Sequence, residues 1–142
     1  MKFIVDVMLG PLARWLRLLG FDTVFAGESV KDKQLVQLAV KEQRVILTKD
    51  RELGMNERAL LVSGAVIGEQ LKFVVKTLGL KVVFPPGSRC SVCNGLLNSV
   101  LDSSREKEMV CASCGKHYWI GAHWKRIEKV VKSLQKVRKS RN

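Results

Sequence analysis

Four cysteines form two C-x-x-C pairs in the last third of the chain. The two pairs are Cys90/Cys93 and Cys111/Cys114. Each pair places two thiolates on one tight turn, and two facing turns can complete a tetrahedron of sulfur atoms around Zn²⁺. Asn94-Gly95 and Gly115 supply the residue types that such turns favour. Because four thiolates close the coordination sphere, the spacing predicts a structural zinc ion that does not itself catalyse hydrolysis.

Two disulfides or a redox-active pair are the alternatives to zinc. Disulfides need an oxidising compartment. The N-terminal stretch MKFIVDVMLG is interrupted by Asp6, is followed closely by Arg14, and has no small-residue cleavage site of the signal-peptide kind. We therefore expect a cytoplasmic protein with reduced thiols. His117 and His123 lie close by, but four cysteines leave no ligand position for either.

A second group of possible metal ligands consists of carboxylates at the ends of predicted strands. Asp6 ends one apolar stretch, Asp50 follows another, and Asp32 lies in the first turn of a predicted helix that starts at the same edge. Hard oxygen ligands without a neighbouring histidine suit Mg²⁺ or Mn²⁺. Such an ion can activate water against a phosphodiester. Glu52 is a candidate fourth ligand or a residue that positions the water.

Helix capping is the alternative role for two of these acids. Ser29-Val-Lys-Asp32 fits a capping box, and Asp50 could cap a short helix after the third strand. Asp6, at the end of a buried strand, has no comparable local role. We therefore expect Asp6, Asp32 and Asp50 to converge on one divalent ion.

Several basic and aromatic residues are candidate contacts for RNA. Arg14 and Arg17 lie three residues apart on the first predicted helix and could clamp a phosphate, with Lys49 and Arg51 on the rim; a solvated helix face is the alternative. The candidates in the cysteine-containing segment are Tyr118, His123 and Trp124. Aromatic rings there could stack on unpaired bases or form a small core, and core packing is our expectation for Trp119.

The elements that must position these residues alternate between strand and helix. Strands are predicted at 2–6, 22–26, 44–48, 58–62 and 81–84, and helices at 9–20, 29–43 and near 68–78. This alternation predicts an α/β domain over residues 1–84, a parallel sheet flanked by helices. The carboxyl ends of its strands then share one edge, where such sheets build their sites.

The rest of the chain divides into two further parts. Phe84-Pro-Pro-Gly-Ser88 marks a linker, residues 85–124 form the predicted four-cysteine zinc ribbon, and residues 125–142 form a basic helical tail. An apolar stripe runs along that helix at Ile127, Val130, Val131, Leu134 and Val137. The chain has a net charge of +12, and its last 18 residues carry eight basic side chains and one acidic side chain. This distribution favours a nucleic-acid partner over a merely solvated tail.

Five segments resemble the PIN-like RNase family of the mut-seven C-terminal domain type. They are VDVMLGPLARWLRLLGFDT, KDKQLVQLA, RVILTKDRE, RCSVCNGLL and CASCGKHYWIGAHW, which together extend to about residue 124. The resemblance implies a PIN-like α/β domain joined to a zinc ribbon, and a metal-dependent ribonuclease. It also implies acidic site positions at Asp6, Asp32 and Asp50. Glu52 stands where related proteins often have an aspartate.

A metal-dependent endoribonuclease is therefore the leading hypothesis, with RNA as its partner. The alternative is a non-catalytic RNA-binding protein, including a ribosome-associated one, whose carboxylates are caps. Phosphoryl transfer through an aspartyl-phosphate is disfavoured because Met8 stands where a second acid would be needed. Nothing in residues 1–84 offers a DNA recognition helix, and no apolar run approaches the ~20 residues that span a membrane. The sequence contains no signal for an oligomeric state.

Overall fold

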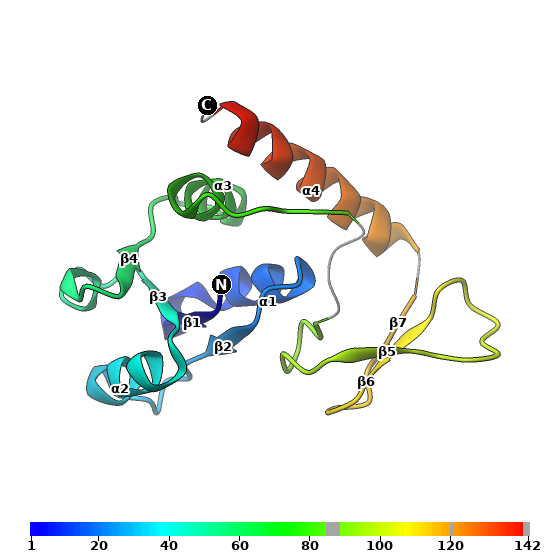
Figure 1. Cartoon of the computed structure of the whole chain (residues 1–142), viewed down its shortest axis with the longest axis horizontal. Helices are drawn as coiled ribbons and strands as arrows, with labels where there is room; N and C mark the ends of the chain where they lie inside the picture. The colour runs from blue at the N-terminus through cyan, green and yellow to red at the C-terminus, as the bar shows by residue number, and fades with distance from the viewer. Residues whose placement is uncertain (85–88, 120, 141–142) are drawn as a thin grey trace.

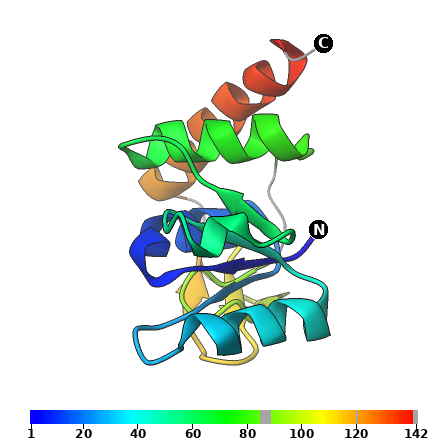
Figure 2. The same ribbon diagram turned by 90° about the vertical axis from the view of Figure 1, so that its left-hand side faces the viewer.

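The centre of the molecule is a parallel sheet in which β1 lies between β2 and β3. The computed structural model describes residues 1–84, 89–119 and 121–140. In these residues the sheet has the strand order β2-β1-β3-β4, formed by Phe3–Val5, Thr23–Phe25, Val45–Thr48 and Ala59–Leu61. Val5 pairs with Phe25 on one side and with Leu47 on the other. The residues that follow these strands therefore meet at one edge, as Figure 2 shows.

Helices cover both faces of this sheet, which confirms the predicted α/β class (Figure 1). Helices α1 (Gly10–Leu18) and α3 (Ile67–Leu78) lie on one face, and α2 (Asp32–Glu42) lies on the other. Pro11 sits in the first turn of α1, where its missing N–H costs nothing. Helices α2 and α3 end where Gln43 and Gly79 adopt left-handed conformations, with φ of 56° and 62°.

Alternating side chains of β1 define the two cores. Phe3 and Val5 point toward α1 and α3, while Ile4 packs with Leu35 and Ala39 of α2. All of these side chains are fully or almost fully buried. Since β1 is apolar on both faces, it has to be the covered central strand of a parallel sheet. This arrangement fixes where the residue after β1, Asp6, must lie.

The expected strand at 81–84 is wrong. Residues 81–83 have no regular secondary structure, yet Val82 is buried in the core and its carbonyl accepts a hydrogen bond of 3.0 Å from Gln135 Nε2. The apolar run therefore packs against the C-terminal helix instead of extending the sheet. The predicted linker falls mainly on residues 85–88, which lie outside the described residues.

Beyond residue 88 the chain forms a small antiparallel sheet and then a long helix. Strands β5 (Leu97–Ser99), β6 (Met109–Cys111) and β7 (His117–Tyr118) pair in that order, and helix α4 (Ala122–Ser140) follows. Helix α4 lies against α3 (Figure 1). Its residues Ile127, Val131 and Leu134 are at most 3% exposed and belong to the same core as β1 and α1. The predicted apolar stripe thus anchors this basic helix on the first domain.

Candidate functional site

Asp6 stands at the carboxyl edge of the sheet and is held by two hydrogen bonds. One carboxylate oxygen accepts from the Val7 backbone N–H at 2.8 Å and thereby caps the short helix η1 (Val7–Leu9). The other oxygen accepts from the Thr48 hydroxyl at 2.9 Å. The expectation that Asp6 has no local structural role is therefore wrong, because the sequence did not indicate that a short helix begins directly after β1.

Asp50 is tied to Asp6 through the buried side chain of Thr48. The Thr48 hydroxyl accepts a hydrogen bond of 3.0 Å from the Asp50 backbone N–H while it donates to Asp6. Two hydrogen bonds through one oxygen put the Asp50 backbone nitrogen within about 6 Å of the Asp6 carboxylate. The Asp50 carboxylate also accepts a hydrogen bond of 3.0 Å from the N–H of Leu53, the first residue of η2 (Leu53–Met55), whose N-cap is Glu52.

Asp32 and Glu52 are exposed at the same edge. Asp32 is the first residue of α2, whose N-cap is Lys31; the Gln34 side chain accepts from the Lys31 N–H at 3.1 Å, so the expected capping box starting at Ser29 does not form. Within the described residues, the four cysteines are the one group of potential ligands whose atoms all lie within 4.8 Å. The acids therefore share an edge without forming a closed site.

The predicted phosphate-binding cations differ in their surroundings. Arg14 and Arg51 are exposed. Lys49 is half-buried, and its ammonium group donates a hydrogen bond of 2.6 Å to the carbonyl of Gly64. Arg14 and Arg51 are thus the two cations of this group that remain open to a phosphate.

The expectation that Arg17 lies on the solvent face beside Arg14 is wrong. Arg17 is 8% exposed, and its guanidinium donates to the carbonyl oxygens of Thr23, Val92 and Ser91 at 2.9, 3.1 and 3.3 Å. It thereby connects α1 and β2 to the first cysteine turn. Burial lowers its pKa, and the nearby thiolates of Cys93 and Cys90 act in the opposite direction. Arg17 is placed to offset the negative charge of a four-thiolate centre.

The four cysteine sulfurs form a compact cluster, as predicted. Cys90 and Cys114 Sγ lie 3.7 Å apart, and Cys93 and Cys111 Sγ lie 3.4 Å apart. Four sulfurs at ~2.3 Å from one Zn²⁺ are about 3.8 Å from each other, so these side chains fit a tetrahedral zinc ion. Backbone N–H groups also point at Cys93 and Cys111 Sγ, each at 3.4 Å. The cysteines are free thiols rather than disulfides.

Tyr118 supports this cluster from inside the ribbon. Its hydroxyl lies 3.0 Å from Cys90 Sγ and accepts a hydrogen bond of 3.2 Å from the Ser91 N–H. Burial raises the pKa of Cys90, but the hydrogen bonds from Tyr118 and from backbone N–H groups outweigh it, and the pKa falls to about 6. Burial and the Cys90 contact raise the pKa of Tyr118 to about 12. The hydroxyl of Tyr118 is therefore engaged with the cysteine cluster.

A carboxylate that the sequence analysis did not identify, Asp22, joins the sheet to the ribbon. It accepts hydrogen bonds of 2.9 Å from Arg44 Nη1 and 2.8 Å from Asn94 Nδ2. Arg89 Nη2 lies 3.7 Å from its second oxygen. Burial raises the pKa of Asp22, but its hydrogen bonds to Asn94 and Arg44 have the larger combined effect and lower it. In the sequence, the one signal for this role is the position of Asp22 directly before β2.

A model of a known family matches nearly all of this chain. The model is described as the Mut7-C RNase domain, and it covers residues 1–131. The chain belongs to the Mut7-C RNase domain family. The matched range includes the α/β domain, the cysteine cluster and the first half of α4, which confirms the resemblance seen in the sequence. No curated protein and no solved structure gives a significant match.

Membership in the Mut7-C family connects the site to RNA, so the surroundings of the ribbon's aromatic residues are relevant. Trp119 is 46% exposed, with the Arg105 guanidinium 3.9 Å from its ring centre, so the expected core packing is wrong. Trp124 instead packs against Phe84, with ring centres 5.5 Å apart. The side chain of His123 lies outside the described residues.

In the described part of this Mut7-C chain no helix is long and apolar enough to cross a membrane.

Proposed function

We propose that this Mut7-C protein is a metal-dependent endoribonuclease that hydrolyses RNA at the carboxyl edge of β1 and β3. The observation that carries the proposal is the hydroxyl of Thr48, which binds the carboxylate of Asp6 and the backbone N–H of Asp50 in a chain that belongs to a family of RNase domains. Strand ends of a parallel sheet are rigid, and rigid positioning of groups around a phosphodiester is the main requirement for its hydrolysis.

The donor set suits Mg²⁺ or Mn²⁺, which Asp6, Asp50 and Asp32 would hold, with Glu52 beside them. When bound, such an ion supplies a water of lowered pKa and offsets the charge of the phosphate. Thr48 keeps Asp6 oriented by donating to one of its oxygens. Asp32 and Asp50 are both exposed at the edge, and the Asp50 carboxylate is held by the Leu53 N–H.

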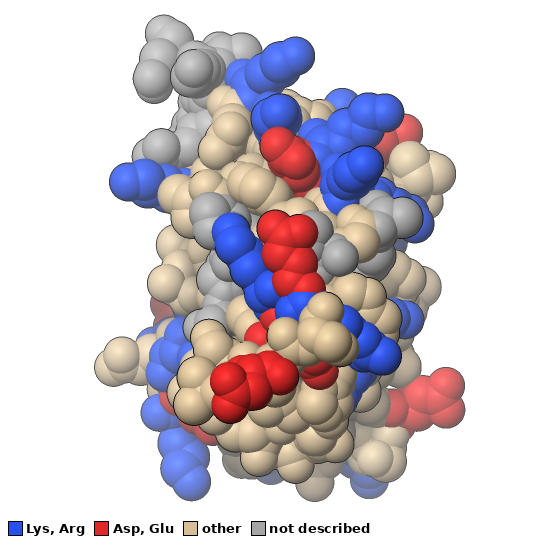
Figure 3. Space-filling view, turned by 90° about the vertical axis from the view of Figure 1, so that its right-hand side faces the viewer, with Lys and Arg blue, Asp and Glu red and all other residues tan. Residues whose placement is uncertain are grey.

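Basic residues around this edge would attract the RNA backbone. Arg14 of α1 and Arg51 after β3 are exposed, and α4 presents Lys125, Lys129 and Lys132 to solvent. Figure 3 shows Lys and Arg side chains gathered in the upper part of one face, above a mixture of acidic and basic side chains. Because the acidic edge and its substrate have the same sign of charge, such neighbouring cations lower the repulsion between them.

RNA binding without cleavage is a second candidate function. It is favoured by the hydrogen bonds that the carboxylates of Asp6 and Asp50 accept from the first N–H groups of η1 and η2, and by the absence of a closed acidic cluster among the described residues. In this case the edge has only a structural role, and the basic surface accounts for the RNA contact.

Cleavage of a labelled single-stranded RNA, with and without Mn²⁺, distinguishes the two functions. We expect Mn²⁺-dependent cleavage that falls about 100-fold or more in Asp6→Asn, with RNA affinity unchanged. Asp102→Asn is the matched control, because Asp102 is exposed on the ribbon and has a φ of 57° that Asn tolerates. Binding without Mn²⁺-dependent cleavage would support the second function, and full activity of Asp6→Asn would exclude this edge as the site.

A further inference from the structure

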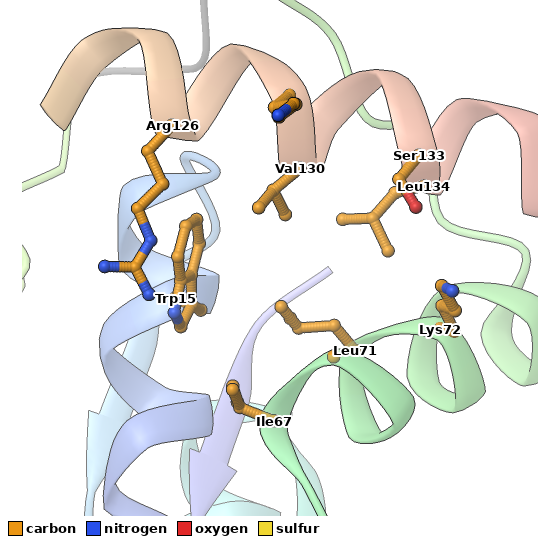
Figure 4. Close-up of a pocket in the computed structure, with 10 residues that line it drawn as sticks. Trp15, Ile67, Leu71, Lys72, Arg126, Val130, Ser133 and Leu134 are labelled. Carbon is orange, nitrogen blue, oxygen red and sulfur yellow. The ribbon is translucent and has the colours of Figure 1, made fainter. Parts of the chain in front are cut away.

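A pocket of about 310 Å³ lies between α1, α3 and α4, on the face of the sheet that α1 and α3 cover. Figure 4 shows Trp15 of α1, Leu71 of α3 and Val130 of α4 facing one another across it. Its volume is at the lower end of the ~300–1,000 Å³ typical of small-ligand sites. The pocket therefore has room for one small planar group.

The floor of the pocket is apolar and contains one large aromatic ring. Trp15 is half-buried and packs against the main core, as do Ile67 and Val130, while Leu71 and Leu134 are buried. The helices of the core hold these side chains in place, so the floor is preformed. A flat ring such as Trp15 offers a surface on which any nucleobase can stack.

The rim of the pocket is basic. Lys72, Arg126 and Lys129 line it together with Ser133, and the lining contains no acidic residue. Within the described chain, none of these three cations forms an ion pair. Arg126 is 6.0 Å from the Trp15 ring centre, at the outer limit of a cation–π contact. The rim is thus complementary to an anion, whereas the floor is complementary to an apolar ring.

We propose that this pocket receives one nucleotide of a single-stranded RNA, with its base against Trp15 and its phosphates on Lys72 and Lys129. The inference rests on the proposed function, because it assigns a binding position to the same substrate. Base pairing and stacking within a duplex would keep the base out of such a pocket, so the occupant is an unpaired nucleotide.

The position of the pocket fits an RNA strand that also passes the acidic edge. Helices α1 and α3 both begin at the carboxyl edge of the sheet, and the pocket is lined by Ile67 and Gly68 at the start of α3. Trp15 is five residues into α1 from Gly10, about 8 Å along the helix axis. One strand can therefore reach both places.

Removal of the two lysines tests the phosphate contacts. We expect that, in the absence of Mn²⁺, the Lys72→Gln/Lys129→Gln protein binds a labelled single-stranded RNA about 10-fold more weakly than the wild type does. The slope of log affinity against log salt should fall by about 1.4, since each single-strand phosphate contact contributes ~0.7. Lys76→Gln/Lys136→Gln is the matched control, because it removes the same charge from exposed positions of the same helices outside the pocket.

Crosslinking tests the base contact separately. Irradiation of the complex with RNA that contains 4-thiouridine should link the RNA to the peptide that includes Trp15. Equal losses of affinity in the two double variants, or crosslinks confined to Trp119 or Trp124, would overturn the inference. A changed sedimentation coefficient in Lys72→Gln/Lys129→Gln with unchanged RNA affinity would also overturn it and identify a second copy of the chain as the occupant. The loss of Mn²⁺-dependent cleavage in Asp6→Asn is independent of all these results. The inference about the pocket and the proposed function can therefore fail separately.

Discussion

The hydroxyl of Thr48 donates a hydrogen bond of 2.9 Å to the carboxylate of Asp6. Thr48 is fully buried, and the same hydroxyl accepts from the Asp50 N–H. One side chain of β3 therefore sets the orientation of an acid directly after β1 and of the backbone that carries a second acid. The relationship links the stability of the sheet edge directly to its proposed chemistry.

Thr48→Val keeps the shape of this side chain and removes both hydrogen bonds. We expect the free energy of unfolding to fall by about 1–2 kcal/mol, because the Asp50 N–H loses its partner. We expect RNA cleavage to fall about 10-fold or more, because Asp6 loses its orientation, while RNA affinity is unchanged. Thr48→Ser retains the hydroxyl and should restore the rate. Wild-type cleavage by Thr48→Val would mean that the orientation of Asp6 is not needed.

Arg17→Gln should destabilise the protein by about 2–3 kcal/mol, because three carbonyl oxygens at the junction of α1, β2 and the ribbon lose a charged donor. Chemical denaturation monitored by circular dichroism measures this change. Arg14→Gln removes the same charge from an exposed position of the same helix and should change stability by less than about 0.5 kcal/mol. Equal effects of the two substitutions would contradict a structural role for Arg17.

Removal of zinc should unfold the ribbon and leave the parallel sheet folded. The ribbon has few buried apolar side chains, and a module of its size depends on the metal for its fold. After chelation, backbone amides of β5 and β6 should exchange rapidly with solvent, whereas those of β1 and β3 should remain protected. We also expect the melting temperature of the sheet domain to fall by a few degrees, since Arg17 and Asp22 lose their ribbon partners. Simultaneous loss of protection in both sheets would contradict this prediction.

Asp22 should make stability depend on pH in the acidic range. Despite the opposing effect of burial, its hydrogen bonds to Asn94 and Arg44 hold its pKa in the folded protein below the ordinary value of an aspartate. Its stabilising contribution is therefore complete above the unfolded pKa and is lost as the pH falls through the lower, folded pKa. Asp22→Asn should be less stable than the wild type at pH 7, and the difference should shrink below about pH 4. A difference that stays constant across this range would show that the charge of Asp22 is not involved.

Features that depend on local patterns were predictable from the sequence. The apolar spacing of α1, α2 and α3 and the two C-x-x-C turns each depend on a few neighbouring residues, and the structure contains them close to their expected positions. The carboxyl-edge location of Asp6 and Asp50 followed from strand–helix alternation alone. Their hydrogen bonds through Thr48 did not, because strand register is set by tertiary packing.

Three of the incorrect predictions concern residues whose surroundings depend on distant contacts. Arg17 reads as a solvated residue of a helix, and its burial becomes apparent only when residues 91–92 lie across the end of α1. Val82 has the composition of a strand residue, but helix α4 covers it. Trp119 was expected in a core, yet so small a ribbon leaves it half-exposed beside Arg105. In each case a segment more than ten residues away determines the outcome.

The packing of α4 on α3 also bears on the order in which the chain can fold during synthesis. Ile127, Val131 and Leu134 complete a core that begins with β1. A nascent chain that has emerged from the ribosome only as far as the ribbon leaves an apolar strip of α3 open to chaperones and proteases. Premature termination between the second cysteine pair and Leu134 would therefore produce a protein that keeps its zinc ligands but leaves this apolar strip of α3 permanently exposed.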